Sequence, residues 1–339
     1  MKKILLFSLI TILVASILTG VVFFSLCHQD KRALDTIAEE SGTKNFILAG
    51  LDDAGDNTDM LMLVSIGGRT GGLSFMQIPR DTYLRMDGRE GKINQLYHYY
   101  SSEYGTKDAA DHLLDAFSNA FSLPIHGYVI FRMQAVEETV DAIGGIPMTL
   151  AEDFVYLDEE TGKEKRIAKG ERVLDGRDAG HYIRHRASYA EGDLGRLDAQ
   201  LRFFSSAFTS LARLKSPVAY LRLYQKIVPK LLTNLSEKDI ISLVTVFIKN
   251  RDGSAVRLMR LPGEATRGNS GSWYYVVNRK ETERLLTQYF TATEGYRFDA
   301  DGRFVRSDRE SFMNIYGDPS HKSRVYTLRE AAEIKVIKK

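Results

Sequence analysis

Residues 46–82 read FILAGLDDAGDNTDMLMLVSIGGRTGGLSFMQIPRDT, and this stretch decides the fold. It contains three short apolar runs, at residues 46–51, 60–66 and 73–78, separated by segments rich in Asp, Gly and Asn. Runs of this length between turn residues are typical of strands, and these are too apolar on both faces to be exposed to solvent. We therefore predict a meander of three buried strands.

Charged side chains stand where these predicted strands end or begin. Short connections usually join adjacent strands, so the end of the first strand, the start of the second and the end of the third share one edge of the sheet. Asp52, Asp59 and Arg80 occupy these points and are expected to lie side by side. In open α/β sheets, ligands favour the crevice at strand ends. Carboxylate oxygens suit Mg²⁺, although solvated turn aspartates are the commoner explanation of such a pair, and Arg80 could simply pair with Asp81.

The rest of the chain alternates between the hydrophobic spacing of helices and that of strands. The predicted elements are a helix after Thr106, a strand at 128–131, a helix at 134–142, a strand at 146–150, a hairpin at 154–167, a short helix from Asp175 to about Tyr182, helices at about 195–214, 218–232 and 238–248, and a strand at 256–261. This alternation indicates an α/β fold with a central mixed β-sheet flanked by helices.

Two arginines lie two residues apart in the sequence Tyr182-Ile183-Arg184-His185-Arg186. We expect an extended chain here, in which residues two apart face the same way, so that Arg184 and Arg186 point together. Two like charges on one face favour an anion between them, and a guanidinium matches phosphate oxygens bidentately. The alternative is a solvated basic strand edge.

Polar groups also stand at the start of the predicted helix at about 195–214. Asp193 precedes this helix, and Arg196 and Gln200 lie one turn apart beside its apolar stripe. The free N–H groups of a helix N-terminus attract anions. An ordinary N-cap is the alternative role of Asp193. Arginines that converge with carboxylates suit a polyphosphate and its divalent cation.

No residue is charged in the N-terminal segment at 4–27. A bilayer core of about 30 Å needs roughly 20 apolar residues as a helix. We predict a cytoplasmic stub at 1–3, a transmembrane helix at 4–27 and a stalk at 28–44. Basic residues flank both ends, so the positive-inside rule gives almost no preference for either orientation of this segment in the membrane. The single cysteine lies in the predicted anchor, and a domain without thiols fits an oxidising exterior, so we expect the domain to face outward.

Composition and missing motifs exclude several functions. The net charge is only +2, and no helix-turn-helix pattern is present, which argues against nucleic acid as a partner. No GxSxG, Walker or Rossmann motif occurs. His181 and His185 are four residues apart, but the expected change from helix to strand between them does not suit a zinc site.

A series of short motifs resembles the LytR-CpsA-Psr family of membrane-anchored cell-wall enzymes. The motifs are Asn45-Phe46-Ile47-Leu48 with Asp52, Thr58-Asp59-Met60-Leu61, Ile78-Pro79-Arg80-Asp81-Thr82, Lys92-Ile93-Asn94, Val140-Asp141-Ala142-Ile143-Gly144-Gly145, Gly170 with Leu174-Asp175-Gly176, Tyr182-Ile183-Arg184-His185-Arg186 and Asp193-Leu194-Gly195-Arg196. They follow the order of the family, and the similarity runs from about residue 45 to residue 290.

The resemblance implies an extracellular catalytic domain at 45–290 and a C-terminal extension at 291–339, in a single-pass protein of the cell membrane. It implies a phosphotransferase that moves an anionic glycopolymer, such as teichoic acid or capsule, from a polyprenyl-pyrophosphate carrier to peptidoglycan. The implied partners are therefore the lipid-linked polymer, peptidoglycan and membrane lipid.

The resemblance also implies roles for residues at the motif positions. The implied metal ligands for Mg²⁺ or Mn²⁺ are Asp52 and Asp59; the implied catalytic residues are Arg80, Arg184, Arg186, Asp193 and Arg196; the implied substrate-binding residues are Lys92, Asn94 and Gln200. In this scheme the arginines clamp the pyrophosphate, and Asp193 helps to activate the attacking hydroxyl.

Two positions depart from the family pattern. Asn57 stands where the family usually has Arg, and Ala199 stands where it often has Arg. With two fewer positive charges, two alternatives stay open. One is a hydrolase that cleaves the polyprenyl pyrophosphate with water, and the other is a catalytically weakened, membrane-tethered regulator or scaffold of the cell envelope.

Overall fold

The computed structural model describes residues 43–336, apart from 53, 68–70, 87–88, 159–160, 187, 215–216, 269–270 and 291–319. The predicted stub and anchor, and the stalk up to residue 42, lie outside the described residues. Within the described part of the chain, no helix has both the length and the apolar character needed to cross a membrane.

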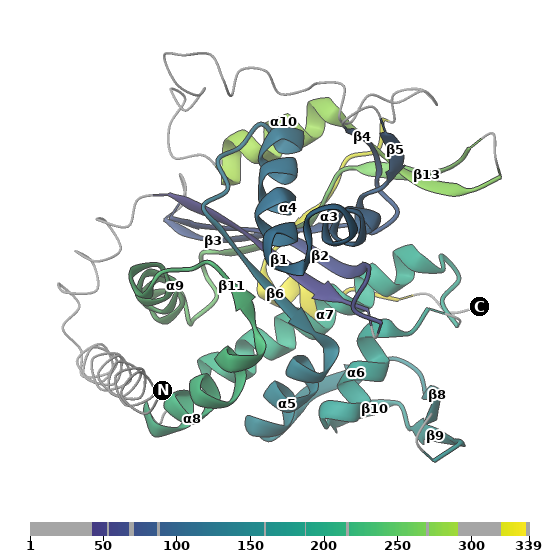
Figure 1. Cartoon of the computed structure of the whole chain (residues 1–339). Helices are drawn as coiled ribbons and strands as arrows, with labels where there is room; N and C mark the ends of the chain where they lie inside the picture. Colours follow the sequence, from purple (N-terminus) through teal and green to yellow (C-terminus); the bar gives the residue numbers. More distant parts are fainter. Residues whose placement is uncertain are drawn as a thin grey trace.

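A seven-stranded sheet forms the centre of the molecule, in the order β11-β6-β1-β2-β3-β12-β15 (Figure 1). Its strands are β1 (Lys44–Leu51), β2 (Thr58–Gly67), β3 (Gly72–Ile78), β6 (Gly127–Arg132), β11 (Leu232–Thr233), β12 (Val256–Arg260) and β15 (Val325–Tyr326). The antiparallel pairing of β1, β2 and β3 confirms the predicted meander. β1 pairs in parallel with β6, and β3 with β12, so the sheet is mixed.

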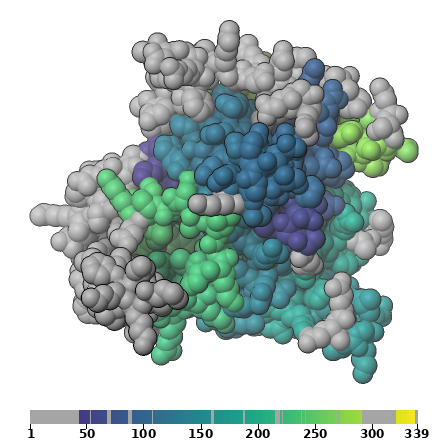
Figure 2. Space-filling view, in the orientation of Figure 1, coloured from purple at the N-terminus to yellow at the C-terminus, as the bar shows by residue number. Residues whose placement is uncertain are grey.

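Helices cover both faces of the sheet, which explains why its strands are apolar throughout. The covering helices are α3 (Leu96–Tyr104), α4 (Thr106–Phe121) and α10 (Arg279–Tyr289) on one face, and α7 (Asp193–Ala212), α9 (Glu237–Lys249) and α11 (Leu328–Ala332) on the other. Ile47 packs into the core between the sheet and the first group of helices, and its neighbour Phe46 packs into the core on the opposite face. Successive side chains of a strand point to opposite faces of a sheet, which explains this arrangement. In the space-filling view only small purple areas of the first strands remain visible (Figure 2).

A smaller core lies beside the sheet and holds the start of α7 in place. Its elements are α5 (Met133–Ala142), β7 (Ile146–Leu150), β8 (Phe154–Asp158), β9 (Lys163–Ile167), β10 (Gly170–Leu174) and α6 (Gly176–Arg184). The predicted hairpin at 154–167 is confirmed as the β8–β9 pair. Asp175 caps α6 by accepting a hydrogen bond from the Asp178 backbone N–H at 2.8 Å.

The remaining elements lie around the sheet and the smaller core. They are β4 (Tyr83–Met86), β5 (Arg89–Lys92), α8 (Pro217–Ile227), β13 (Gly263–Arg267) and β14 (Trp273–Val277). The predicted helix at 218–232 stops at Ile227 because Pro229 lacks the N–H that a continuing helix needs. β15 falls inside the predicted C-terminal extension, so the boundary placed at residue 290 does not mark the end of the sheet.

Candidate functional site

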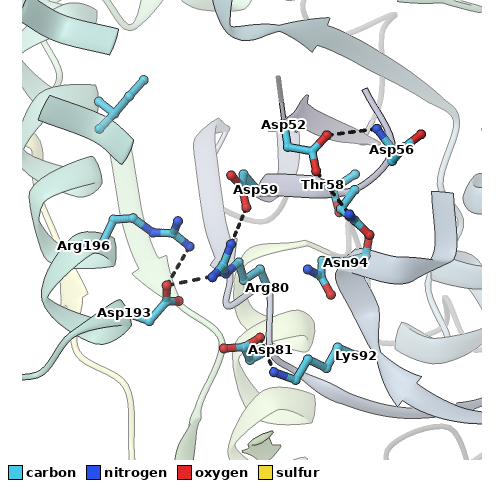
Figure 3. A network of polar contacts seen from close by, with 12 residues as sticks. Asp52, Asp56, Thr58, Asp59, Arg80, Asp81, Lys92, Asn94, Asp193 and Arg196 are labelled. Carbon is cyan, nitrogen blue, oxygen red and sulfur yellow. Dashed lines mark hydrogen bonds and ion pairs between the residues drawn. The ribbon is translucent and has the colours of Figure 1, made fainter. Parts of the chain in front are cut away.

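Four charged side chains meet at the edge where β1 and β3 end and β2 begins (Figure 3). Arg80 Nη1 donates a hydrogen bond to Asp59 Oδ1 at 2.6 Å, and Arg80 Nε lies 3.6 Å from Asp193 Oδ1. Arg196 Nη2 lies 2.8 Å from the same Asp193 oxygen. We call these four residues the strand-end cluster. Its formation confirms that Asp59 and Arg80 are neighbours, and it adds the first turn of α7 to them.

The strand-end cluster leaves buried donors and an acceptor without hydrogen bonds. Arg80 Nε, Arg196 Nε, Arg196 Nη2 and Asp193 Oδ1 are buried but find no hydrogen-bond partner among the described residues. Arg196 and Asp193 are an ion pair by distance, yet their groups are not oriented for a directed bond. Only 3% of the Arg196 side chain is exposed. Because buried polar groups are normally bonded, the arrangement favours a ligand that supplies acceptor oxygens.

Both arginines of the cluster carry a positive charge in this environment. Burial acts to lower the pKa of Arg80, but the hydrogen bond to Asp59 and the charge of Asp193 outweigh it and raise the pKa. Burial lowers the pKa of Arg196, and Asp193 opposes this shift only in part. Since arginine titrates far above neutral pH, the site presents two desolvated cations, which stabilise an anion strongly.

The loop between β1 and β2 holds Asp52 as an anion at the same edge. Asp52 Oδ1 accepts hydrogen bonds from the backbone N–H groups of Gly55 at 2.8 Å and Asp56 at 2.9 Å, and Oδ2 accepts one from Asn57 Nδ2 at 3.1 Å. Burial acts to raise the pKa of Asp52, but these bonds outweigh it and lower the pKa. Asn57 therefore orients Asp52 at a position where the family usually has a cation.

The three predicted substrate-binding residues differ in their contacts and in how deeply they are buried. Lys92 Nζ lies 2.9 Å from Asp81 Oδ1, outside the strand-end cluster. The Asn94 backbone N–H donates to the Arg80 carbonyl at 3.2 Å, and Asn94 Oδ1 is buried without a partner in the described chain. Gln200 is buried: Nε2 donates to the Ile183 carbonyl at 2.9 Å, and Oε1 accepts from a side chain of β3 at 2.7 Å. Gln200 thus fixes α7 against β3.

The predicted extended geometry around Arg184 is wrong. α6 continues through Arg184, because the His185 N–H still bonds to the His181 carbonyl at 2.9 Å. Arg184 consequently turns back along its helix, where Nε donates to the Gly180 carbonyl at 3.1 Å and Nη2 lies 3.6 Å from Glu137.

Arg186 and Ala199 differ in their relation to the strand-end cluster. Arg186 follows α6 and is exposed, and its charge contributes to lowering the pKa of Arg196, so it lies within electrostatic range of the cluster. Ala199 is completely buried in the smaller core, where the surrounding side chains leave it no exposed surface.

Arg132 is a residue that the sequence analysis missed. It ends β6 and lies opposite Leu51 in the parallel pair, one residue before Asp52. Its guanidinium packs on Gly55, since a Cβ added to Gly55 would come within 2.5 Å of Arg132 Nη2. The available signal was an arginine at a strand end, but only the pairing of β6 with β1 brings that end to the Asp52 loop.

Comparison with known proteins identifies the family. The profile of the LytR_cpsA_psr family matches residues 25–291. The chain belongs to this family. A relative from Oceanobacillus iheyensis, named polyisoprenyl-teichoic acid–peptidoglycan teichoic acid transferase TagU, is 28% identical over 265 residues, which cover 76% of this chain and 78% of that protein.

Two solved structures share the fold of this chain. Protein gbs0355 from Streptococcus agalactiae superposes with a TM-score of 0.62 at 21% identity, over 76% of this chain and 94% of that one. TagT bound to LIIa-WTA gives a TM-score of 0.55 at 22% identity, over 72% of this chain and 88% of that one. At these identities the likeness establishes the architecture, a mixed sheet flanked by helices.

Proposed function

We propose that this protein transfers an anionic glycopolymer from a polyprenyl-pyrophosphate carrier to peptidoglycan. The observation that carries the proposal is the strand-end cluster, in which buried guanidinium groups have N–H donors that no acceptor among the described residues uses. A pyrophosphate supplies oxygens for such donors, and arginine binds phosphate in a planar, bidentate manner. The names of the relatives, which are teichoic acid transferases, support this class of substrate.

The reaction is a displacement at phosphorus. A hydroxyl oxygen of the acceptor attacks the phosphorus that carries the glycopolymer, and a new P–O bond forms. The P–O bond to the other phosphate breaks, polyprenyl phosphate leaves, and a phosphodiester joins polymer and acceptor. Phosphoryl transfer is accelerated mainly by positioning and by stabilising charge on the phosphate oxygens, which Arg80 and Arg196 do in this scheme. Asp193 Oδ1, which accepts no hydrogen bond in the described chain, takes the proton of the attacking hydroxyl.

Asp52 and Asp59 fit a role as ligands of Mg²⁺ or Mn²⁺. Asp59 uses Oδ1 for Arg80, while its Oδ2 accepts no hydrogen bond from the described residues. The hydrogen bonds that lower the pKa of Asp52 keep this carboxylate ionised and oriented. The described residues contain no group of three or more His, Cys, Asp or Glu able to hold a metal alone. Mg²⁺ usually binds through one or two carboxylates, waters and substrate phosphates, and it neutralises charge on those phosphates.

The same proposal includes an outward-facing domain on a single-pass anchor at 4–27. The carrier lipid is confined to the membrane, so a tether of this kind keeps the strand-end cluster close to its substrate. The uncharged length of the segment supports the anchor.

The test uses the full-length protein in detergent, with a polyprenyl-pyrophosphate-linked glycopolymer, purified peptidoglycan and Mg²⁺. We expect stoichiometric release of polyprenyl phosphate and attachment of polymer to peptidoglycan. Release of polyprenyl phosphate with no attached polymer would identify a hydrolase that uses water at the same site. No release in any condition, with the donor bound, would identify a binding protein and refute the proposed transfer.

A further inference from the structure

A cavity lies beside the N-terminus of α7. Its volume is about 460 Å³, and its walls come from the start of α7, the end of β12, the β13–β14 hairpin and residues 321–326. Glu191, Leu194, Tyr275 and Tyr326 are among the residues that line it. We call this cavity the α7 pocket. Among its lining residues, only Leu194 belongs to the sequence motifs that resemble the family.

Two short pieces of chain connect the α7 pocket to the strand-end cluster. Glu191 and Leu194 line the pocket and flank Asp193, and the Leu194 N–H donates to the Glu191 carbonyl at 3.2 Å. On the opposite wall, the Tyr275 N–H donates to the carbonyl of Asp81, the residue after Arg80, at 2.8 Å. The backbone therefore connects walls of the pocket to the residues beside Asp193 and Arg80.

The lining of the α7 pocket suits a polar ligand. Five of the twelve lining residues are charged, namely Glu191, Arg260, Glu264, Lys322 and Arg324. Four of these five residues, all but Arg260, are exposed to solvent, and a hydrated, charged lining disfavours a lipid chain.

The cations and the carboxylates of the pocket differ in their pairing. Arg260 forms an ion pair with Asp198, and Arg324 lies 3.0 Å from Glu330 with its guanidinium 5.0 Å from the centre of the Tyr326 ring. By contrast, Glu191 and Glu264 form no ion pair within the described ranges of the chain. Unpaired carboxylates accept hydrogen bonds from hydroxyl or ammonium groups.

We infer that the α7 pocket binds the acceptor, a glycan strand of peptidoglycan with its peptide. This inference rests on the proposed function. Sugar hydroxyls and peptide ammonium groups donate to Glu191 and Glu264, and Lys322 is available to peptide carboxylates. The acceptor hydroxyl then reaches Asp193 from the α7 side while the pyrophosphate occupies the Arg80 side. The two substrates meet at one carboxylate without sharing a binding surface.

The experiment compares transfer with hydrolysis in the double variant Glu191→Gln/Glu264→Gln of the full-length protein. Glu171→Gln on β10, an exposed strand remote from the pocket in sequence, is the matched control. We expect the double variant to release polyprenyl phosphate to water at the unmodified rate. Its transfer to peptidoglycan falls about tenfold or more through a higher KM for peptidoglycan, because charge-assisted hydrogen bonds to the acceptor are lost. The control changes neither rate.

Unchanged transfer in the double variant overturns the inference, as does an equal loss of transfer and hydrolysis, which would place the two glutamates in the donor site. A second readout is calorimetric binding of a soluble disaccharide-peptide fragment of peptidoglycan to the full-length protein. We expect binding that the double variant loses and the control keeps; equal binding by all three proteins refutes the inference. If the unmodified protein binds the fragment but never releases polyprenyl phosphate, the proposed reaction fails while the acceptor pocket stands.

Discussion

Two charged clusters of this protein, of similar composition, differ in whether their buried polar atoms form hydrogen bonds. Beside α6, Tyr156 Oη donates to Asp178 Oδ1 at 2.6 Å, Lys165 Nζ lies 2.6 Å from the same oxygen, and Arg177 bonds to Asp158 at 3.0 Å. We call this group the hairpin cluster. None of its side-chain atoms is buried without a hydrogen bond. In the strand-end cluster, by contrast, Arg80, Asp193 and Arg196 all keep such atoms.

The difference shows that the orientation of polar groups distinguishes a binding site from a structural network. Both clusters bring carboxylates and cations within ion-pair distance. Only the strand-end cluster holds its cations at angles that leave N–H groups free, and this costs stability. Such a cost is expected where a ligand completes the network. The following predictions test this contrast, from the largest expected effect to the smallest.

Arg196→Met breaks the strand-end cluster and gives the largest effect. We expect the rate of polymer transfer to fall by about 10²–10³-fold, the usual result of removing one preorganised donor to the transition state. The free energy of unfolding should fall, because the buried Asp193 oxygen loses its nearer cation and keeps only Arg80 at 3.6 Å. Transfer assays and urea denaturation measure the two quantities.

Arg177→Met in the hairpin cluster is the matched control for Arg196→Met. Its side chain is 43% exposed, so its ion pair with Asp158 contributes less than about 1 kcal/mol, and transfer should not change. A comparable loss of transfer in both variants would mean that the two clusters do not differ in function.

Asp178→Asn removes the carboxylate that Tyr156 and Lys165 share in the hairpin cluster. We expect the free energy of unfolding to fall by about 1–3 kcal/mol, because a largely buried acceptor of a charged donor is lost, while the activity of the folded fraction is retained. Burial acts to lower the pKa of Lys165, but Asp178 outweighs it and raises the pKa. The stabilisation from this pair is therefore complete below the ordinary lysine value of 10.5 and disappears as pH rises above it.

The pH dependence supplies the check on Asp178→Asn. Urea denaturation at neutral pH and above pH 10.5 should show the difference between the unmodified protein and the variant shrinking at high pH. A difference that stays constant over this range would contradict the contribution of the Lys165 charge.

Gly55→Ala tests the support of the Asp52 loop. Gly55 has φ +80°, and an added Cβ would meet the Arg132 guanidinium. A left-handed backbone costs a non-glycine residue roughly 1–2 kcal/mol, and we expect Gly55→Ala to lose this much unfolding free energy and more, because the Arg132 guanidinium must also move aside. Gly71→Ala is a suitable control, since its φ is +63° and its added Cβ meets nothing within 4 Å. A loss in Gly55→Ala no larger than in the control would show that Arg132 does not pack on this loop.

Asn57→Ala gives the smallest effect and tests whether the Asn57 side chain stabilises the ionised form of Asp52. Removal of the Asn57 hydrogen bond should move the lowered pKa of Asp52 up toward its ordinary value of 3.8. A carboxylate with a lowered pKa stabilises the fold above its unfolded pKa and loses that contribution as pH falls through the folded value. The variant should therefore lose stability relative to the unmodified protein only above about pH 3.8. Carboxyl ¹³C NMR titration of Asp52 measures the shift, and an unchanged titration contradicts it.

The local part of the fold could be predicted from the sequence. The β1–β3 meander was predictable because its connections are short, and it placed Asp59 beside Arg80. The parallel partners β6 and β12 were not, because nothing in their residues specifies a neighbour that is distant in the chain. Arg132 and the α7 pocket were missed for this reason.

The error at Arg184 has a different cause. A helix end depends on one backbone hydrogen bond, here from the His185 N–H to the His181 carbonyl, and the side chains around it carry no capping signal. Two further helical residues, Ile183 and Arg184, turned the Arg184 side chain toward Glu137. The direction of a side chain at such a boundary cannot be read from its spacing.

The parallel pairing of β3 with β12 has a consequence for biosynthesis. Leu73 lies opposite Val256, and Gln77 opposite Arg260, so the strand that leads to Arg80 gains its second neighbour only when most of the polypeptide has been made. Until then its apolar edge is open to pairing with other chains. A chain that stops before Val256 should therefore aggregate, and contacts so distant in sequence predict slow folding of the complete protein.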